Sequence, residues 1–266
     1  ATFSTSTGAF NNGNIAVTLG FNNDADPETD WNLLGNPYPS ALDADTFLTA
    51  NSSVIGGTLY FWTHNTPVTA GANNTNADYV LWNVTGGTAS CSGCIAPNGN
   101  IATGQGFFAQ ALTSGIVSNL FTNNMRVTTA GNNTNFYKGA TVPDEKDKIW
   151  LNLRADGEFS QLLIGFFDDA TNNADRKYDG LRLDSGGNLS FHSIIENDPY
   201  GIQGKAPLTT LEEIPLGFTT TITENFKISI DHLEGKLNSS TVYLIDKSTT
   251  PETQHNLNDA DYEFTI

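Results

Sequence analysis

Residues 149–153 read Ile-Trp-Leu-Asn-Leu and residues 161–167 read Gln-Leu-Leu-Ile-Gly-Phe-Phe, and these two stretches decide the fold class. In the first, Ile149, Leu151 and Leu153 take alternate positions, which places them on one face of an extended strand. The second is an apolar run suited to a central strand. Asn, Thr, Gly and Ser fill the gaps between such stretches, and these residues favour turns over helices.

Short stretches rich in Val, Ile, Phe, Tyr and Trp recur along the chain and are separated by frequent turn signals. Besides the two above, they cover residues 14–19, 58–62, 189–194, 214–221, 226–230, 241–246 and 261–266. Such spacing is typical of sandwiches and barrels. The sequence therefore predicts an all-β protein with two tandem antiparallel β-sandwich domains of jelly-roll or Ig-like type. A single short turn of helix is expected within residues 208–215.

The composition changes near residue 140. Residues 1–140 hold seven acidic and two basic residues, whereas residues 141–266 hold 22 and 10. The stretch 139–148 is small, contains a proline and then becomes charged, as linkers do. We expect one domain over 1–140, rich in Asn, Thr and Gly, and a second, charged domain over 141–266.

Charge and hydropathy exclude several classes of function. The 266 residues include 12 basic and 29 acidic side chains, for a net charge of −17. Nucleic-acid binding needs a basic face, and anionic membranes repel such a chain. No run approaches the roughly 18 apolar residues of a membrane span. We expect no nucleic-acid partner and no membrane insertion.

The only two cysteines are Cys91 and Cys94, in a loop rich in Gly, Ser, Asn and Pro. A local disulfide that stiffens a surface loop is the favoured interpretation, and it indicates an oxidising compartment. A reactive dithiol is an alternative, although that chemistry usually places CxxC at a helix N-terminus after a strand. Two free thiols are the other alternative.

Residues 31–43, WNLLGNPYPSALD, contain a rigid, irregular loop. Gly35 permits positive φ, Pro37 and Pro39 fix φ, and the Asn36 amide can bond nearby backbone. We interpret the loop as a fold-defining corner, with a ligand-binding loop as the alternative. The Gly104-Gln105-Gly106 turn has the same two interpretations, and Gln105 is placed to bond the opposite loop.

Residues 31–43 and, downstream, Gly104-Gln105-Gly106-Phe107-Phe108 together resemble a pattern of large exported proteins of Bacteroidetes. The second half resembles the segment that follows it there, through residues 164–166, 170–172, 175, 178–180, 202–204, 214–218 and 228–231. The resemblance implies the β-sandwich region that precedes the C-terminal sorting domain of type IX secretion cargo. It also implies a secreted or cell-surface location, and an interior piece of a longer chain with neighbouring domains.

Two acidic segments are candidate calcium sites, because hard oxygen ligands suit a hard cation. The first contains Asp24, Asp26 and Asp30, and the second contains Asp168, Asp169, Asp175 and Asp179. The first lacks the mid-loop glycine and distal glutamate of an EF-hand. In the second, Arg176 and Lys177 can balance the carboxylates without metal. Solvated acidic turns are the alternative for both.

Trp62, Tyr79 and Trp82 are candidate sugar platforms, because sugars stack on flat rings flanked by polar side chains. Most aromatic residues of a sandwich lie in the core, which is the competing interpretation. The four histidines are scattered, and no nucleophile elbow, P-loop or Rossmann motif occurs. A pair of facing carboxylates suited to glycoside hydrolysis is defined by the distance between the two groups in space. The sequence does not give that distance.

We therefore expect a non-catalytic structural or adhesive module of an exported surface protein, with acidic loops that calcium would stabilise. The alternative is a carbohydrate-binding module of a secreted polysaccharide-degrading system, and an enzyme is the third and least favoured hypothesis. The expected partner is a surface glycan or another surface protein.

Overall fold

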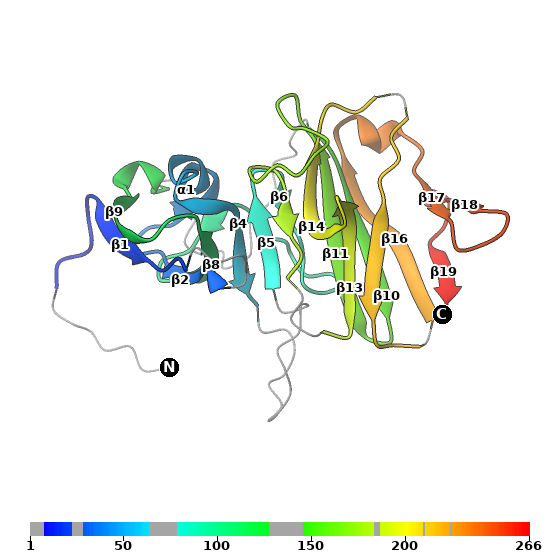
Figure 1. Cartoon of the computed structure of the whole chain (residues 1–266), viewed down its shortest axis with the longest axis horizontal. Coiled ribbons are helices and arrows are strands. Elements are labelled where there is room, and N and C mark those ends of the chain that lie inside the picture. The colour runs from blue at the N-terminus through cyan, green and yellow to red at the C-terminus, as the bar shows by residue number, and fades with distance from the viewer. Residues whose placement is uncertain are drawn as a thin grey trace. The chain divides into compact units, whose positions relative to one another are not determined.

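The computed structural model describes residues 8–22, 29–63, 79–127, 146–183, 187–209, 211–223 and 225–266. Strands dominate these residues, which confirms the all-β prediction (Figure 1). The chain forms two compact units, one from residues 1–56 and 100–136, the other from residues 57–99 and 137–266. None of the helices within the described ranges is long and apolar enough to cross a membrane.

These units differ from the predicted domains, 1–140 and 141–266, mainly in one segment, and the last boundary between them falls after residue 136. Residues 57–99 belong with the C-terminal part of the chain. Composition gave no sign of this, because the segment is as neutral and Asn-rich as its sequence neighbours. Of the predicted linker 139–148, residues 139–145 lie outside the described residues.

The first unit contains three antiparallel strand pairs, β1 with β9, β2 with β8, and β3 with β7. Its elements are β1 (Ile15–Leu19), β2 (Trp31–Gly35), β3 (Leu42–Asp43), α1 (Ala44–Ala50), β7 (Asn100–Ile101), β8 (Gly106–Ala111), β9 (Gly115–Phe121) and the 3-10 helix η3 (Asn123–Met125). The sequence did not predict α1. Its N-cap Asp43 accepts a hydrogen bond from the Thr46 N–H, and its fully buried Phe47 contacts Phe107 and Phe121.

The second unit is built on one large sheet with strand order β15-β13-β14-β11-β10-β16-β19, and β12 also pairs with β14. Its strands are β10 (Asp147–Ala155), β11 (Glu158–Phe166), β12 (Gly180–Leu181), β13 (Leu189–Ile195), β14 (Asp198–Lys205), β15 (Leu216–Thr220), β16 (Asn225–Glu234) and β19 (Tyr262–Thr265). The sheet is antiparallel except for the parallel pair β11 and β14.

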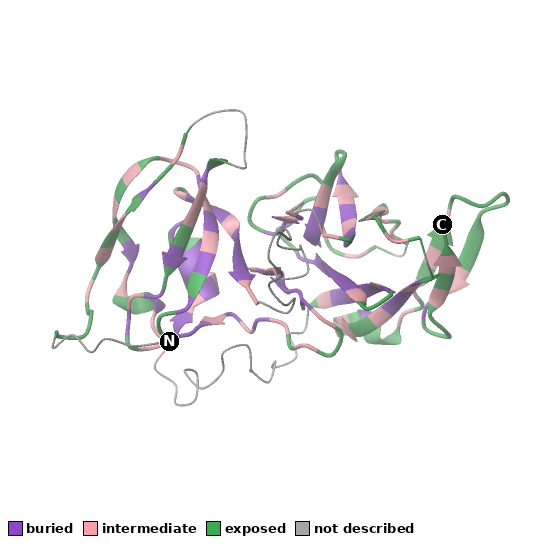
Figure 2. Cartoon of the chain, turned by 90° about the horizontal axis from the view of Figure 1, so that it is seen from below, coloured by how far each residue is buried: buried purple, intermediate pink, exposed green. Residues whose placement is uncertain are grey.

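The prediction of a helical turn at 208–215 is wrong for the described residues of this range, which form no regular secondary structure. The physical reason is that Leu208 and Ile214 pack against the apolar face of the large sheet instead. A 3-10 helix, η4 (Gly235–Ser239), follows β16. The hairpin of β17 (Tyr243–Asp246) and β18 (Thr253–Asn256) is exposed or half-buried along its length (Figure 2).

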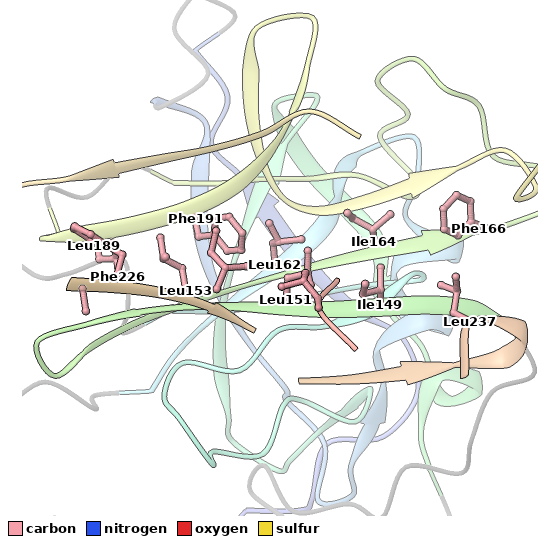
Figure 3. Close-up of a cluster of buried hydrophobic side chains, with 13 residues drawn as sticks. Ile149, Leu151, Leu153, Leu162, Ile164, Phe166, Leu189, Phe191, Phe226 and Leu237 are labelled. Atoms are coloured by element: carbon pink, nitrogen blue, oxygen red, sulfur yellow. The ribbon is translucent and has the colours of Figure 1, made fainter. Parts of the chain in front are cut away.

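One face of the large sheet carries the main core of the second unit. Alternate residues of β10 and β11, among them Ile149, Leu151 and Leu153, join Phe191 and Phe226 in one buried cluster (Figure 3). These alternate positions of β10 are the ones that the sequence pattern assigned to one face.

The other face of the sheet is covered by residues of the segment 57–99. This segment contains most of β4 (Ile55–Trp62), together with β5 (Tyr79–Asn83) and β6 (Gly86–Gly87). Trp150, on the opposite side of β10 from the main core, donates its indole N–H to the Gly87 carbonyl at 2.9 Å. A Cβ on Gly86 would lie 3.0 Å from Leu163, so the chain approaches the sheet closely there.

Candidate functional site

The corner formed by residues 35–40 and the turn at 104–106 is organised by one buried amide. The Asn36 Nδ2 donates to the carbonyls of Ser40 (2.8 Å) and Ile101 (2.9 Å), and its Oδ1 accepts the Tyr38 N–H. The backbone of Asn36 also pairs with Gly104 and Gln105. The two sequence motifs therefore meet, as a corner that is held together internally.

Other side chains around this corner also form contacts that hold it together. Gln105 is buried and accepts the Ala102 N–H at 2.8 Å, so its side chain closes its own turn, while its backbone carbonyl bonds the opposite loop. The Tyr38 hydroxyl donates to the Gly13 carbonyl, and the Arg126 guanidinium lies 5.2 Å from the Tyr38 ring centre. These contacts support the interpretation as a fold-defining corner.

Of the first acidic segment, Asp24 and Asp26 lie outside the described residues. Asp30 is buried, with 4% of its surface exposed, and its Oδ1 accepts the Asn22 N–H at 2.7 Å. This carboxylate is therefore already bonded to the backbone of the preceding segment.

The second acidic segment, residues 168–179, is a loop that lies against the segment 57–99. The Tyr178 carbonyl accepts hydrogen bonds from Asn83 (2.9 Å) and Thr85 (2.8 Å), and the Asp179 carbonyl accepts one from Thr58. All three donors are buried. Hydrogen bonds to the backbone of the loop therefore hold it in place, in addition to the ion pair of its side chains.

Its four carboxylates have different surroundings. Asp169 pairs with Lys177 at 3.0 Å, and hydrogen bonds from Tyr178 and Lys177 lower the pKa of Asp169 to about 2. Asp175 accepts the Lys177 N–H, while Asp168 is exposed. In the part of the chain that the structure describes, no three His, Cys, Asp or Glu side chains are grouped to hold a metal ion.

Asp179 is the buried member of the loop, with 6% of its surface exposed. Its carboxylate accepts the N–H groups of Asp175 and Gly204. Burial raises the pKa of Asp179 to about 6, against the opposing effect of these two donors. The side chain therefore joins the loop to β14.

We expect the second unit to become more stable relative to an Asp179→Asn variant as the pH falls from 7 to 5. The folded-state pKa near 6 exceeds the ordinary value of 3.8, so the folded state takes up a proton first. The gain is about 1 kcal/mol of unfolding free energy. Urea unfolding of both proteins at the two pH values measures it. An unchanged difference between them would show that Asp179 does not titrate in this range.

The three candidate sugar platforms are placed differently. Trp62 and Tyr79 pair across β4 and β5, with ring centres 5.0 Å apart in an edge-to-face arrangement, and both are half-buried. Trp82 lies against two glycines, since a Cβ on Gly87 or Gly99 would come within 2.9 Å or 2.7 Å of its indole. Trp62 and Tyr79 thus lie together, whereas Trp82 is packed against backbone.

Cys91 and Cys94 form a disulfide within a turn in which the Cys94 N–H donates to the Cys91 carbonyl. Residues 90–92 of this loop form one wall of an open pocket of about 600 Å³. The other walls are residues 154–159 around the β10–β11 turn, the start of β16 at Asn225 and Lys227, and Asp261.

A chain of side-chain hydrogen bonds holds the pocket wall in place. The Ala89 N–H donates to Gln161 at 2.7 Å, Gln161 donates to Asn152 at 2.8 Å, and Asn152 donates to Asp231 at 2.9 Å. Asp231 occupies a bulge of β16 and contacts the His232 ring nitrogen at 2.7 Å. Three strands thus fix the segment that leads into the disulfide loop.

Apart from Cys91, sequence reasoning did not single out the pocket residues, because they come from four separate segments. One sequence signal could have located part of the pocket. Asp156-Gly157 is a dipeptide favoured in two-residue hairpin turns, and both residues have positive φ here. That turn brings Arg154 next to Phe159, with the guanidinium 5.7 Å from the ring centre.

Comparison with known proteins gives one match. Neither the curated proteins nor the solved structures contain a match to this chain. A family model described as "Domain of unknown function (DUF8693)" matches residues 1–266. The chain therefore belongs to the DUF8693 family.

Proposed function

We propose that this chain is a non-catalytic structural or adhesive module of an exported cell-surface protein, with tandem antiparallel β-sandwich domains of jelly-roll or Ig-like type. The observation that carries the proposal is a set of buried amide side chains that connect the backbones of distant segments. Asn36 bonds Ile101, Asn51 bonds Leu120, and Asn83 bonds Tyr178, across 65, 69 and 95 residues of sequence.

Such connections suit a module that must keep its shape under load. Each buried amide satisfies backbone groups that would otherwise be buried without partners, so a loop cannot detach without exposing or orphaning them. Asn83 alone donates to Thr58 and Tyr178 and accepts the Thr85 N–H. Loops held in this way act as fixed parts of the scaffold.

Other features support export and a surface location. The disulfide favours an oxidising compartment, and the net charge of −17 favours solubility in salty surroundings. The resemblance to type IX secretion cargo adds a surface location, neighbouring domains in a longer chain, and a surface glycan or another surface protein as the partner.

Calcium stabilisation of the acidic loops is part of the proposal. In the loop 168–179 the exposed carboxylates of Asp168 and Asp169 are the accessible ligands, because Asp179 is bonded to backbone. In the other loop Asp30 is the described member. Binding of calcium to the folded state alone would raise its stability.

The proposal predicts that Asn83→Ala weakens the second unit. We expect a loss of about 2 kcal/mol in unfolding free energy, because three buried hydrogen bonds go. In single-molecule pulling on the full chain between reference domains, the force peak of the second unit should fall. Asn172→Ala, at an exposed position, is the matched control and should leave that peak unchanged.

Two results would count against this function. An Asn83→Ala chain that unfolds at the same force as the unaltered chain would mean that the amide contacts carry no load. Equal force peaks and melting temperatures with calcium and with EDTA would remove the calcium part of the proposal alone.

A second candidate function is carbohydrate binding, favoured by the half-buried ring pair of Trp62 and Tyr79. A glycan array with the unaltered chain and a Trp62→Ala variant tests it. Loss of glycan binding in the variant would place the sugar on this ring pair.

A further inference from the structure

We propose that the pocket beside the disulfide loop binds a neutral, hydroxyl-rich saccharide. The inference rests on the second candidate function, carbohydrate binding, but assigns it to a site that the aromatic residues do not form. The pocket volume of about 600 Å³ lies within the roughly 300–1,000 Å³ of small-molecule sites.

Arg154 supplies hydrogen-bond donors to this pocket. A guanidinium has five N–H donors, and here one of its nitrogens, Nη1, donates to the Ser229 hydroxyl at a long 3.4 Å. Its Nε has no hydrogen-bond partner but is buried, so a ligand in the pocket cannot reach it, and within the described ranges the side chain forms no ion pair. The terminal nitrogens of the guanidinium are therefore the part of Arg154 that can donate to a ligand in the pocket.

Acceptors line the same pocket. The carboxylates of Asp156, Glu158 and Asp261 are at its walls, and Lys227 lies 3.6 Å from Asp261. Two cationic and three anionic side chains leave a formal charge of −1. A strongly charged ligand would meet groups of its own sign, whereas a sugar hydroxyl both donates and accepts and fits this alternation.

The pocket is also held in shape before any ligand arrives. The disulfide restrains one wall, the hydrogen-bond chain from Ala89 to Asp231 fixes the segment leading into it, and the tight Asp156-Gly157 turn fixes the other. Preformed sites lose less conformational entropy on binding, which is what a weakly hydrophobic ligand such as a sugar requires.

The test is a glycan array carrying neutral hexose and pentose oligosaccharides beside matched uronate and sulfated ones, followed by calorimetry with the best neutral oligosaccharide. We expect neutral oligosaccharides to bind, and Arg154→Gln to weaken binding at least tenfold. Ser92→Trp should do the same by filling the rim. Because Ser92 is exposed, that variant should fold normally, and Ser53→Trp in an exposed turn is its matched control.

Three outcomes would overturn the proposal that this pocket binds a saccharide. The first is that no neutral oligosaccharide binds. The second is preferential binding of uronate or sulfated oligosaccharides. In the third, binding survives Ser92→Trp but is lost in Trp62→Ala, which would leave the carbohydrate function standing at the ring pair and remove it from this site.

Discussion

Replacing Gly57 by alanine should destabilise the second unit by about 3 kcal/mol or more. A Cβ at this position of β4 would lie 1.8 Å from the Arg176 carbonyl oxygen and 2.8 Å from its carbonyl carbon. Both partners are backbone, so neither can rotate away, and the loop 168–179 must lift from the strand. Lifting it would also break the hydrogen bonds of Tyr178 and Asp179 to Asn83 and Thr58. Overpacking of this kind costs about 1–3 kcal/mol before such losses are added.

The neighbouring glycine is a control on the same strand. A Cβ on Gly56 would meet atoms of Gln110 at 3.5–3.7 Å, which is ordinary van der Waals contact. Gly56→Ala should therefore change stability by less than about 1 kcal/mol, since alanine also lowers the entropy of the unfolded chain. Urea unfolding of the two variants, followed by tryptophan fluorescence, makes the comparison. Equal losses in both would mean that the loop does not contact β4 at Gly57.

Gly57 also shows why the sequence predicts strands better than it predicts how they are covered. In β10, apolar residues at every second position, Ile149, Leu151 and Leu153, mark one face of the strand. The structure places those residues in one core. The close contact of Gly57 with the Arg176 backbone is possible only because glycine has no side chain. Glycine in a strand signals close approach without identifying what approaches, so the placement of residues 57–99 is not visible in the sequence.

The acidic loop gives a similar lesson for candidate sites. From the sequence, Asp168, Asp169, Asp175 and Asp179 have the same chemistry and differ only in spacing. In the structure, Asp179 is buried against the N–H of Gly204, and Asp169 is exposed beside Lys177. Burial and partners distinguish these carboxylates, and the burial of Asp179 involves a contact with β14 that the spacing of the loop residues does not reveal.

The second large effect is expected for Asn36→Ala in the first unit, a loss of about 3 kcal/mol. The alanine would leave the carbonyls of Ser40 and Ile101 and the N–H of Tyr38 without their side-chain partner. Ile101 and Tyr38 are fully buried, so water cannot replace these bonds without opening the corner. Each buried group left without a partner costs about 1–3 kcal/mol. Asn124→Ala, at an exposed position of η3, is the control and should change stability little.

An aspartate at position 36 separates the hydrogen bonds from the volume of the side chain. Asn36→Asp keeps the acceptor for the Tyr38 N–H but presents a carboxylate oxygen to two carbonyl oxygens, so it should be at least as destabilising as alanine at pH 7. Repulsion and burial raise the pKa of such a carboxylate. The aspartate variant should therefore regain stability as the pH falls, because the protonated form can donate one hydrogen bond, while the alanine variant has no such group. Urea unfolding at pH 7 and pH 5 shows the difference. Parallel pH profiles for the two variants would mean that the Asn36 amide supports the corner through packing and not through its donors.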